Sequence, residues 1–367
     1  MNTNDLLKKL VQIESYSGHE TNLANFIVDW ANDHSLPVEK QNGNIVIKFL
    51  NHSAKALIFN AHMDTVKPGG LNSWSVPPSG SGSGVVKGNK LYGLGASDDK
   101  AAIAAFLILA SQINIFTLSK DVFIVFVTHE ETSGAGSQSF VNYFQKNYAD
   151  TYNDVSAVIG EPTDLDTIEI GHRGNIFLKI IINGNSGHGS SPKKIKKHAI
   201  LEQIKIVKKV TKFGTILSKK YADPVLGSPS FCLTGIQSDS ASVNKVPSTC
   251  YSTWDIRTTP ELHDKVVYLI QKQVGKSVKI EHISPPTQFG LTALKSKIVD
   301  LVQETVPNLQ TKISPGSNDI CFFTKAKIPA ITFGPGKKDS IHKPDEFVEI
   351  DKVEKSVAIY KKLLEEY

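Results

Sequence analysis

The chain has 367 residues, of which 40% are hydrophobic and 21% charged, and its formal net charge is +5. These values predict a globular protein with a large core and two domains. The longest apolar run, Ala101 to Ala110, is too short to span a bilayer. The basic residues form no pattern with aromatic residues that is typical of nucleic-acid binding. We therefore expect neither a membrane nor a nucleic acid as a partner.

The cysteines argue against a disulfide framework. Cys232, Cys250 and Cys321 have no paired spacing, so they also argue against a thiolate metal site. The N-terminus reads as an amphipathic helix, without an apolar core of signal-peptide length. These features lead us to expect a cytoplasmic protein.

The first 172 residues alternate between helical and strand patterns. Two helices are expected before residue 35, the second because apolar residues recur at helical spacing from Leu23 to Ala31. Short runs rich in Val, Ile and Phe then predict buried strands of a largely parallel sheet. The helix after Asp98 is apolar on nearly all sides, so it should be buried. The fold class predicted for this region is α/β.

From residue 175 the pattern changes to strand, helix, strand, strand, helix, strand, which is the ferredoxin-like α+β arrangement. The expected segments are 176–182, 197–213, 230–237, 249–257, 260–274 and 277–283. After Pro285-Pro286 the first pattern resumes. We therefore predict a domain of residues 1–174 and 285–367 with a smaller domain, 175–284, inserted into it. Two consecutive domains are the alternative, but they would leave the C-terminal segment without a partner sheet.

Three of the predicted strands run into residues that can bind a metal. His62 and Asp64 follow the first of these strands, Glu130 and Glu131 the second, and Glu161 the third. The ligand site of an open α/β sheet lies beyond the carboxyl ends of its strands, so these side chains should converge. So many carboxylates would repel each other unless cations neutralise them.

A late histidine, His342, adds a second imidazole to this set. Each residue taken alone is more often structural than functional, and Asp98, at a helix start, could be only a cap. Together, two imidazoles and several carboxylates suit a pair of zinc ions, whereas a magnesium site would use fewer histidines.

Only two of the 41 basic residues are arginine, Arg173 and Arg257. Lysine cannot replace arginine where a planar group must hold a carboxylate at two points. Both are therefore candidates for binding a substrate carboxylate, and a structural salt bridge is the alternative.

In this order, from residue 62 to about residue 346, the motifs resemble those of the M20 family of metallopeptidases and amidohydrolases. That family includes acetylornithine and acetyl-lysine deacetylases, succinyl-diaminopimelate desuccinylase and glutamate carboxypeptidases. The resemblance implies a zinc-peptidase-like catalytic domain, an inserted ferredoxin-like lid and dimerisation domain, and two Zn²⁺ ions per subunit, with Co²⁺ as a substitute. One departure is Leu94, where many relatives carry arginine between two glycines; it should alter only local salt bridging.

The resemblance also implies a role for each motif residue. The implied metal ligands are His62 and Glu161 for one ion, Glu131 and His342 for the other, and Asp98, often followed by a cis peptide bond, between the two. Asp64 would support His62, and Glu130 would be the general base.

The inserted domain carries further implied roles. His188, in the segment Asn185–Ser190, would reach the active site of a partner subunit and polarise the scissile carbonyl, which implies a homodimer. Asn244 and Arg257 would bind a substrate carboxylate, and Arg173 lies at the domain junction.

The resulting expectation is hydrolysis of an amide bond in a small carboxylate-bearing substrate by an N-acyl amino acid deacylase. A zinc carboxypeptidase or dipeptidase of the same family is the alternative. A non-catalytic peptide-binding protein would lack a ligand or the base, and none is missing. A dinuclear phosphoesterase would show more basic or glycine-rich cradling near the metals.

Overall fold

The computed structural model describes residues 2–240 and 242–367, which form two compact units. The first unit comprises the residues up to Gly171 together with Gly290–Ser314 and Asn318–Tyr367. The second comprises His172–Phe289 and Pro315–Ser317. Within the described ranges, no helix has both the length and the apolar character needed to cross a membrane.

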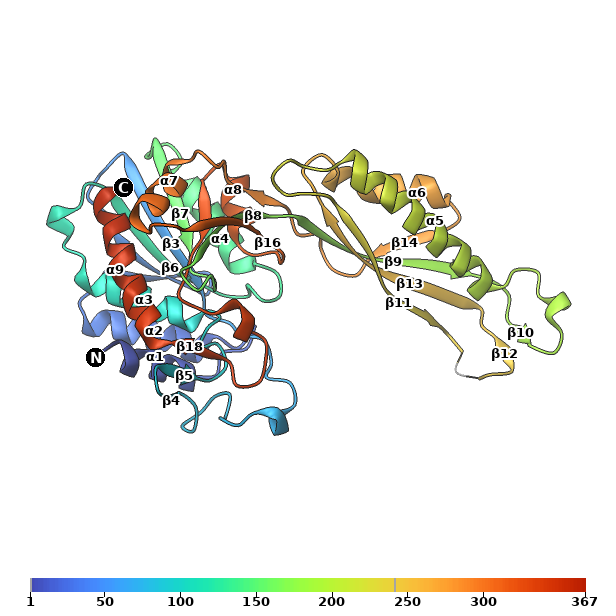
Figure 1. The fold of residues 1–367 in the computed structure, drawn as a ribbon, viewed down its shortest axis with the longest axis horizontal. Helices are drawn as coiled ribbons and strands as arrows, with labels where there is room; N and C mark the ends of the chain where they lie inside the picture. Colours follow the sequence, from blue (N-terminus) through green and yellow to red (C-terminus); the bar gives the residue numbers. More distant parts are fainter. Residues whose placement is uncertain (1, 241) are drawn as a thin grey trace. The chain divides into compact units, whose positions relative to one another are not determined.

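A nine-stranded sheet forms the centre of the first unit (Figure 1). Its order is β1-β2-β6-β3-β7-β17-β8-β15, and β16 pairs with β8 off this path. The strands are β1 (Val38–Gln41), β2 (Asn44–Phe49), β3 (Lys55–His62), β6 (Asp121–Val127), β7 (Asp154–Ile159), β8 (Thr167–His172), β15 (Gly290–Leu291), β16 (Gln310–Ser314) and β17 (Ala330–Thr332).

The middle of this sheet is parallel. β3 pairs in parallel with both β6 and β7, and β17 pairs in parallel with β7. Every residue of β6 is buried, which explains why its sequence is a continuous apolar run. Because β3, β6 and β7 run in the same direction, their carboxyl ends lie at one edge of the sheet.

Alternate side chains of these strands pack on opposite faces. Phe59 of β3 contacts Phe106 and Tyr360, from two helices on one face. Phe123 of β6 packs against Phe140 and other residues of a second cluster on the opposite face. The period of two along each strand therefore produces a three-layer core.

The remaining elements of the first unit surround this sheet. Its α-helices are α1 (Thr3–Gln12), α2 (Thr21–Asp33), α3 (Lys100–Gln112), α4 (Ala135–Tyr148), α7 (Lys297–Thr305), α8 (Ile320–Lys325) and α9 (Ile350–Glu366). Its short 3₁₀-helices are Leu71–Ser73, Ile115–Thr117 and Lys338–Ser340. A small three-stranded sheet consists of β18 (Phe347–Glu349), β5 (Lys90–Tyr92) and β4 (Val85–Lys87).

The second unit is a four-stranded antiparallel sheet in the order β11-β13-β9-β14, with α5 and α6 side by side on one face (Figure 1). The elements are β9 (Gly174–Asn183), α5 (Ala199–Lys220), β11 (Ser230–Ser238), β13 (Thr249–Thr258), α6 (Val266–Val274) and β14 (Lys279–His282). A two-stranded ribbon of β10 (Gly187–His188) and β12 (Lys245–Val246) and two 3₁₀-helices, Pro192–Lys194 and His263–Lys265, complete it.

The predicted fold class is confirmed: the structure is a mixed α/β fold with a largely parallel central sheet. The predicted helix at 197–213 was too short. The helix runs to Lys220 because Val210, Gly214 and Leu217 continue its buried side. The helix predicted at 260–274 begins later, as a 3₁₀ turn over His263–Lys265 followed by α6.

Candidate metal centre

The residues at the carboxyl edge of the sheet come from four segments of the first unit. His62 ends β3, Glu130 and Glu131 follow β6, and Glu161 follows β7. Asp98 precedes α3, and the peptide bond between Asp98 and Asp99 is cis.

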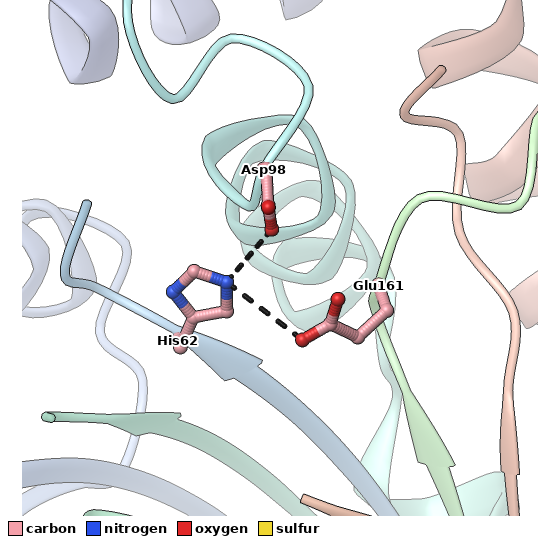
Figure 2. Close-up of side chains that lie close together, drawn as sticks. All are labelled: His62, Asp98 and Glu161. Carbon is pink, nitrogen blue, oxygen red and sulfur yellow. Dashed lines mark hydrogen bonds and ion pairs between the residues drawn. The ribbon is translucent and has the colours of Figure 1, made fainter. Parts of the chain in front are cut away.

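His62, Asp98 and Glu161 form a first group of donor atoms, all within 4.8 Å of one another. His62 Nε2 lies 2.9 Å from Asp98 Oδ1 and 3.8 Å from Glu161 Oε1. Figure 2 shows the three side chains pointing toward one another, from the end of β3, the turn before α3 and the segment after β7.

Asp98, Glu131 and His342 form a second group with the same spacing limit of 4.8 Å. His342 Nε2 lies 3.1 Å from Glu131 Oε1 and 3.3 Å from Asp98 Oδ2. Asp98 thus belongs to both groups, with Oδ1 facing His62 and Oδ2 facing His342. A carboxylate in this arrangement can bridge two cations.

The donor set fits zinc. Each group offers one imidazole nitrogen and carboxylate oxygens, the ligands that zinc takes when no thiolate is present. His62 Nδ1 lies 2.8 Å from the backbone oxygen of Asp64, so this nitrogen would carry the proton and leave Nε2 free to bind a metal.

The electrostatics of the site also fit a cation. Burial raises the pKa of the Glu161 carboxyl well above 4.5, and the nearby carboxylates of Asp98 and Asp99 raise it further. Burial, Glu161 and Asp319 raise the pKa of Glu130 in the same way. Positive charge at this position would oppose both shifts and keep both carboxylates ionised.

Asp98 and His62 shift each other's pKa. Burial alone would raise the pKa of Asp98, but His342 and His62 outweigh it and hold the pKa below its usual value. Burial lowers the pKa of His62, but hydrogen bonds to Asp64 and Asp98 outweigh this and raise it well above 6.5.

The carboxylate of Asp64 contacts the segment after β6 more closely than it contacts the His62 ring. Its carboxylate accepts hydrogen bonds from the backbone N–H groups of Glu130 (2.9 Å) and Glu131 (3.1 Å) and from the hydroxyl of Ser17 (2.6 Å). The distance from its Oδ1 to His62 Nδ1 is 3.6 Å. The carboxylate of Asp64 therefore holds the backbone that carries Glu130 and Glu131, while its backbone oxygen orients His62.

The other predicted site residues lie in the second unit, in two groups. His188 and Asn244 are exposed neighbours at the β10–β12 ribbon, where the Gly189 N–H donates to the Asn244 backbone oxygen (2.7 Å). Arg173 directly precedes β9, and Arg257 lies near the end of β13.

The two arginines differ in their partners. Arg257 forms a two-point ion pair with Asp255, with distances of 2.9 and 3.1 Å. Arg173 donates to the backbone oxygen of Ser228 (2.6 Å). Burial lowers the pKa of Arg173, and the charge of Arg257 lowers it further.

The sequence interpretation gave no role to Ser17, Asp319 or Glu346. Asp319 is buried, accepts a hydrogen bond from Ser137 (2.5 Å), and has a pKa raised to about 7 by burial. Asp319 could have been noticed in the sequence as an acidic residue directly before the apolar start of α8. Glu346, in the same loop as His342, was visible in the sequence, but its contacts depend on the folded loop.

The comparisons with known proteins agree with this geometry. The model of peptidase family M20/M25/M40 matches residues 58–366. An acetylornithine deacetylase from Buchnera aphidicola is 26% identical over 330 residues, covering 85% of this chain and 80% of the relative. A succinyl-diaminopimelate desuccinylase from Wolbachia pipientis is 27% identical over 385 residues, covering 99% of this chain and 92% of the relative.

Among solved structures, an M20 family metallo-carboxypeptidase from Sulfolobus solfataricus has a TM-score of 0.77 at 19% identity, covering 100% of this chain and 99% of that one. At this identity the likeness describes the fold. The family match spans most of the chain, including both groups of donor atoms. The chain therefore belongs to peptidase family M20/M25/M40, and it is a hydrolase of amide bonds in a metal-dependent family.

Proposed function

We propose that the chain is a dinuclear zinc amidohydrolase that removes the acyl group from a small N-acyl amino acid with a free carboxylate. The observation that carries this proposal is the position of Asp98 between two groups of nitrogen and oxygen donors. The proposed ligands of one zinc ion are His62 and Glu161, and those of the other are Glu131 and His342. Asp98 would bind both ions. Cobalt would substitute for zinc in such a site.

When bound, zinc ions would supply Lewis acidity and lower the pKa of water at the site. Glu130 is proposed as the general base, which takes a proton from the attacking water and delivers it to the nitrogen of the leaving amine. Glu130 belongs to neither donor group, which leaves its carboxylate free to accept and return a proton. Asp64 would keep Glu130 in place, because its carboxylate accepts hydrogen bonds from the backbone N–H groups of Glu130 and Glu131. The products would be a carboxylate and a free amine.

The second unit is proposed to be a lid and dimerisation domain whose His188 stabilises the developing oxyanion in a partner subunit's site. The exposure of His188 supports this, because a histidine that serves another subunit must be accessible. Asn244 and Arg173 are proposed to bind the substrate carboxylate. The ion pair with Asp255 supports the structural role of Arg257, so we rank Arg257 below Arg173 as a substrate contact.

A homodimer is supported by an exposed edge and exposed apolar side chains of the second unit. β11 is an edge strand of its sheet, and strand edges readily pair with another chain. Large apolar side chains are exposed on α5 and on β11: Leu201, Ile204, Ile216, Leu233 and Ile236. A second copy of the chain is the proposed occupant of this surface.

The three free cysteines support a reducing, cytoplasmic setting.

The substrate class rests on the relatives, whose names describe deacetylation and desuccinylation. A carboxypeptidase or dipeptidase activity is the second candidate, supported by the name of the Sulfolobus enzyme with the same fold. The deciding experiment is a hydrolysis assay of the zinc- or cobalt-loaded protein on N-acetyl-ornithine, N-acetyl-lysine, N-succinyl-diaminopimelate, dipeptides and a phosphate ester. Cleavage of an N-acyl amino acid in preference to the dipeptides supports the proposal. Cleavage of the phosphate ester alone would overturn it.

A further inference from the structure

Glu346 is a buried carboxylate beside the metal centre that has no assigned role. It is 1% exposed, and its two side-chain oxygens face the turn that carries Asp98. Oε1 accepts hydrogen bonds from the backbone N–H groups of Ser97 (2.8 Å) and Asp98 (3.1 Å), and Oε2 accepts one from Gly95 (3.1 Å). One side chain thus binds three backbone donors of the same turn.

Further hydrogen bonds join the loop that carries Glu346 to the turn before Asp98. Ser97 Oγ accepts a hydrogen bond from the Lys337 N–H (2.5 Å) and donates to the backbone oxygen of Phe347 (3.1 Å). The Gly93 N–H donates to the backbone oxygen of Glu346 (2.9 Å). The segment from Lys337 to Phe347, which includes His342, is therefore tied to the segment from Gly93 to Asp98.

Burying the Glu346 carboxylate costs desolvation free energy, which an apolar side chain at this position would not. A buried carboxylate loses its hydration and is tolerated only when donors or charges replace the water. Glu346 obtains three backbone N–H donors, which lower its pKa, but burial and the negative charge of Asp98 outweigh them and raise the pKa to about 8. A glutamine would fill the same volume without the charge, but its amide N–H₂ would face one of the backbone N–H groups.

We propose that Glu346 is a positioning residue that fixes Asp98, shared by both donor groups, relative to His342. Asp98 and His342 are far apart in the sequence but must hold ligand atoms close together, with 3.3 Å between them in the structure. Outer groups that orient metal ligands commonly control metal affinity. The inference deepens the proposed function and rests on its two-metal site.

The test is the metal affinity of the Glu346→Gln variant, measured by competition with a chelator for Zn²⁺ on the metal-free protein. Loss of such an outer contact typically weakens metal binding by about 10- to 100-fold, and we expect both ions to be affected because Asp98 serves both. In the Co²⁺-loaded variant the visible absorption spectrum should also shift, because it reports ligand geometry. The milder Ser97→Ala variant should change both readouts in the same direction.

Asp121→Asn is the matched control. Asp121 is 2% exposed and also accepts backbone N–H groups, from Asn51 (2.8 Å) and Ser53 (3.2 Å), but at the opposite end of β6 from Glu130. It should lower thermal stability and leave metal affinity and the cobalt spectrum unchanged.

Three outcomes decide the matter. Weaker zinc binding in Glu346→Gln, with unchanged binding in Asp121→Asn, supports the proposal. Unchanged zinc affinity and cobalt spectrum in both the Glu346→Gln and Ser97→Ala variants would overturn it and leave the two-metal site intact. Failure of the unmodified protein to bind two ions would refute the proposed function itself. If Glu346→Gln does not fold, the Ser97→Ala result decides.

Discussion

Glu130 and Glu131 are adjacent in the sequence but have different tasks in the proposed site. Glu131 lies 3.1 Å from His342 and belongs to a donor group, whereas Glu130 belongs to neither group. Asp64 accepts the backbone N–H of both residues, so their side chains start from a fixed backbone. The proposal therefore assigns metal binding and proton transfer to two consecutive residues.

Replacement of Glu130 by glutamine should lower kcat by about 100- to 10,000-fold, because an amide cannot accept and return the proton. Zinc content should stay at two ions per chain, measured by elemental analysis of the dialysed protein. Glu131→Gln is the control, and it should retain fewer ions because a donor of the second group is weakened. Loss of zinc from the Glu130 variant would show instead that Glu130 is a ligand.

At this scale the sequence predicts some residues better than others. His62, Glu131 and Glu161 could be proposed as ligands because each follows an apolar strand, and strand direction alone brings such ends together. The contacts of Glu346 could not be predicted. They depend on which backbone N–H groups the turn before Asp98 presents, and no local pattern encodes that orientation.

Among the elements, the end of β7 and the loop after β17 approach each other closely. A Cβ atom on Gly334 would lie 1.8 Å from the backbone oxygen of Gly160, the residue before Glu161. The absence of a side chain at Gly334 therefore sets the position of a proposed ligand.

Gly334→Ala should push these two segments apart and destabilise the protein by about 1–3 kcal/mol, the usual cost of an overpacked core. Zinc affinity should fall as well, because Glu161 would move. Gly70→Ala is a suitable control, since nothing lies within 4 Å of its added Cβ. Chemical denaturation and zinc titration measure the two effects. An unchanged midpoint and affinity for Gly334→Ala would contradict this account of the β7 end.

We expect His263, in the 3₁₀ turn before α6, to make the second unit sensitive to acid. The side chain is buried, its Nδ1 lies 2.7 Å from Thr258 Oγ1, and burial lowers its pKa below 6.5. The unfolded chain therefore binds a proton at a higher pH than the folded unit does. The stability from neutral His263 is present above about pH 6.5 and is lost as the pH falls through the folded pKa.

Backbone hydrogen exchange in β9 and β13 should accordingly speed up as the pH falls below about 6.5, after correction for intrinsic rates. His263→Gln removes the titrating group, so the pH dependence should become flatter. The exposed His282 provides the control, and His282→Gln should keep the original slope. Equal slopes for all three proteins would rule out His263 as the cause.

The predictability of the elements follows their periodicity. The buried α3 and the central strands were predicted because long apolar segments of one period allow few alternatives. The ends of α5 and α6 were misplaced, because helix ends depend on tertiary contacts such as the burial of Leu217.

At the scale of the whole molecule, the proposed mechanism requires two chains for each complete site. His188 lies in the second unit and the donor groups in the first, and in the proposal His188 serves the partner's site. His188→Ala should lower kcat by about 100- to 1000-fold, the usual cost of one lost oxyanion donor. Its zinc content should not change.

A mixture of two inactive variants tests whether this site is shared. In a mixed dimer of Glu130→Gln and His188→Ala chains, one site combines both defects, while the other combines the intact Glu130 of one chain with the intact His188 of its partner. Random exchange of subunits in a two-fold dimer would therefore restore about a quarter of the unmodified activity. If His188 acted within its own chain, every site would keep one defect and no activity would return. The measurement is the hydrolysis rate after the two proteins are unfolded and refolded together, with each variant refolded alone as the control. Sedimentation of the active species as a monomer would independently exclude a shared site.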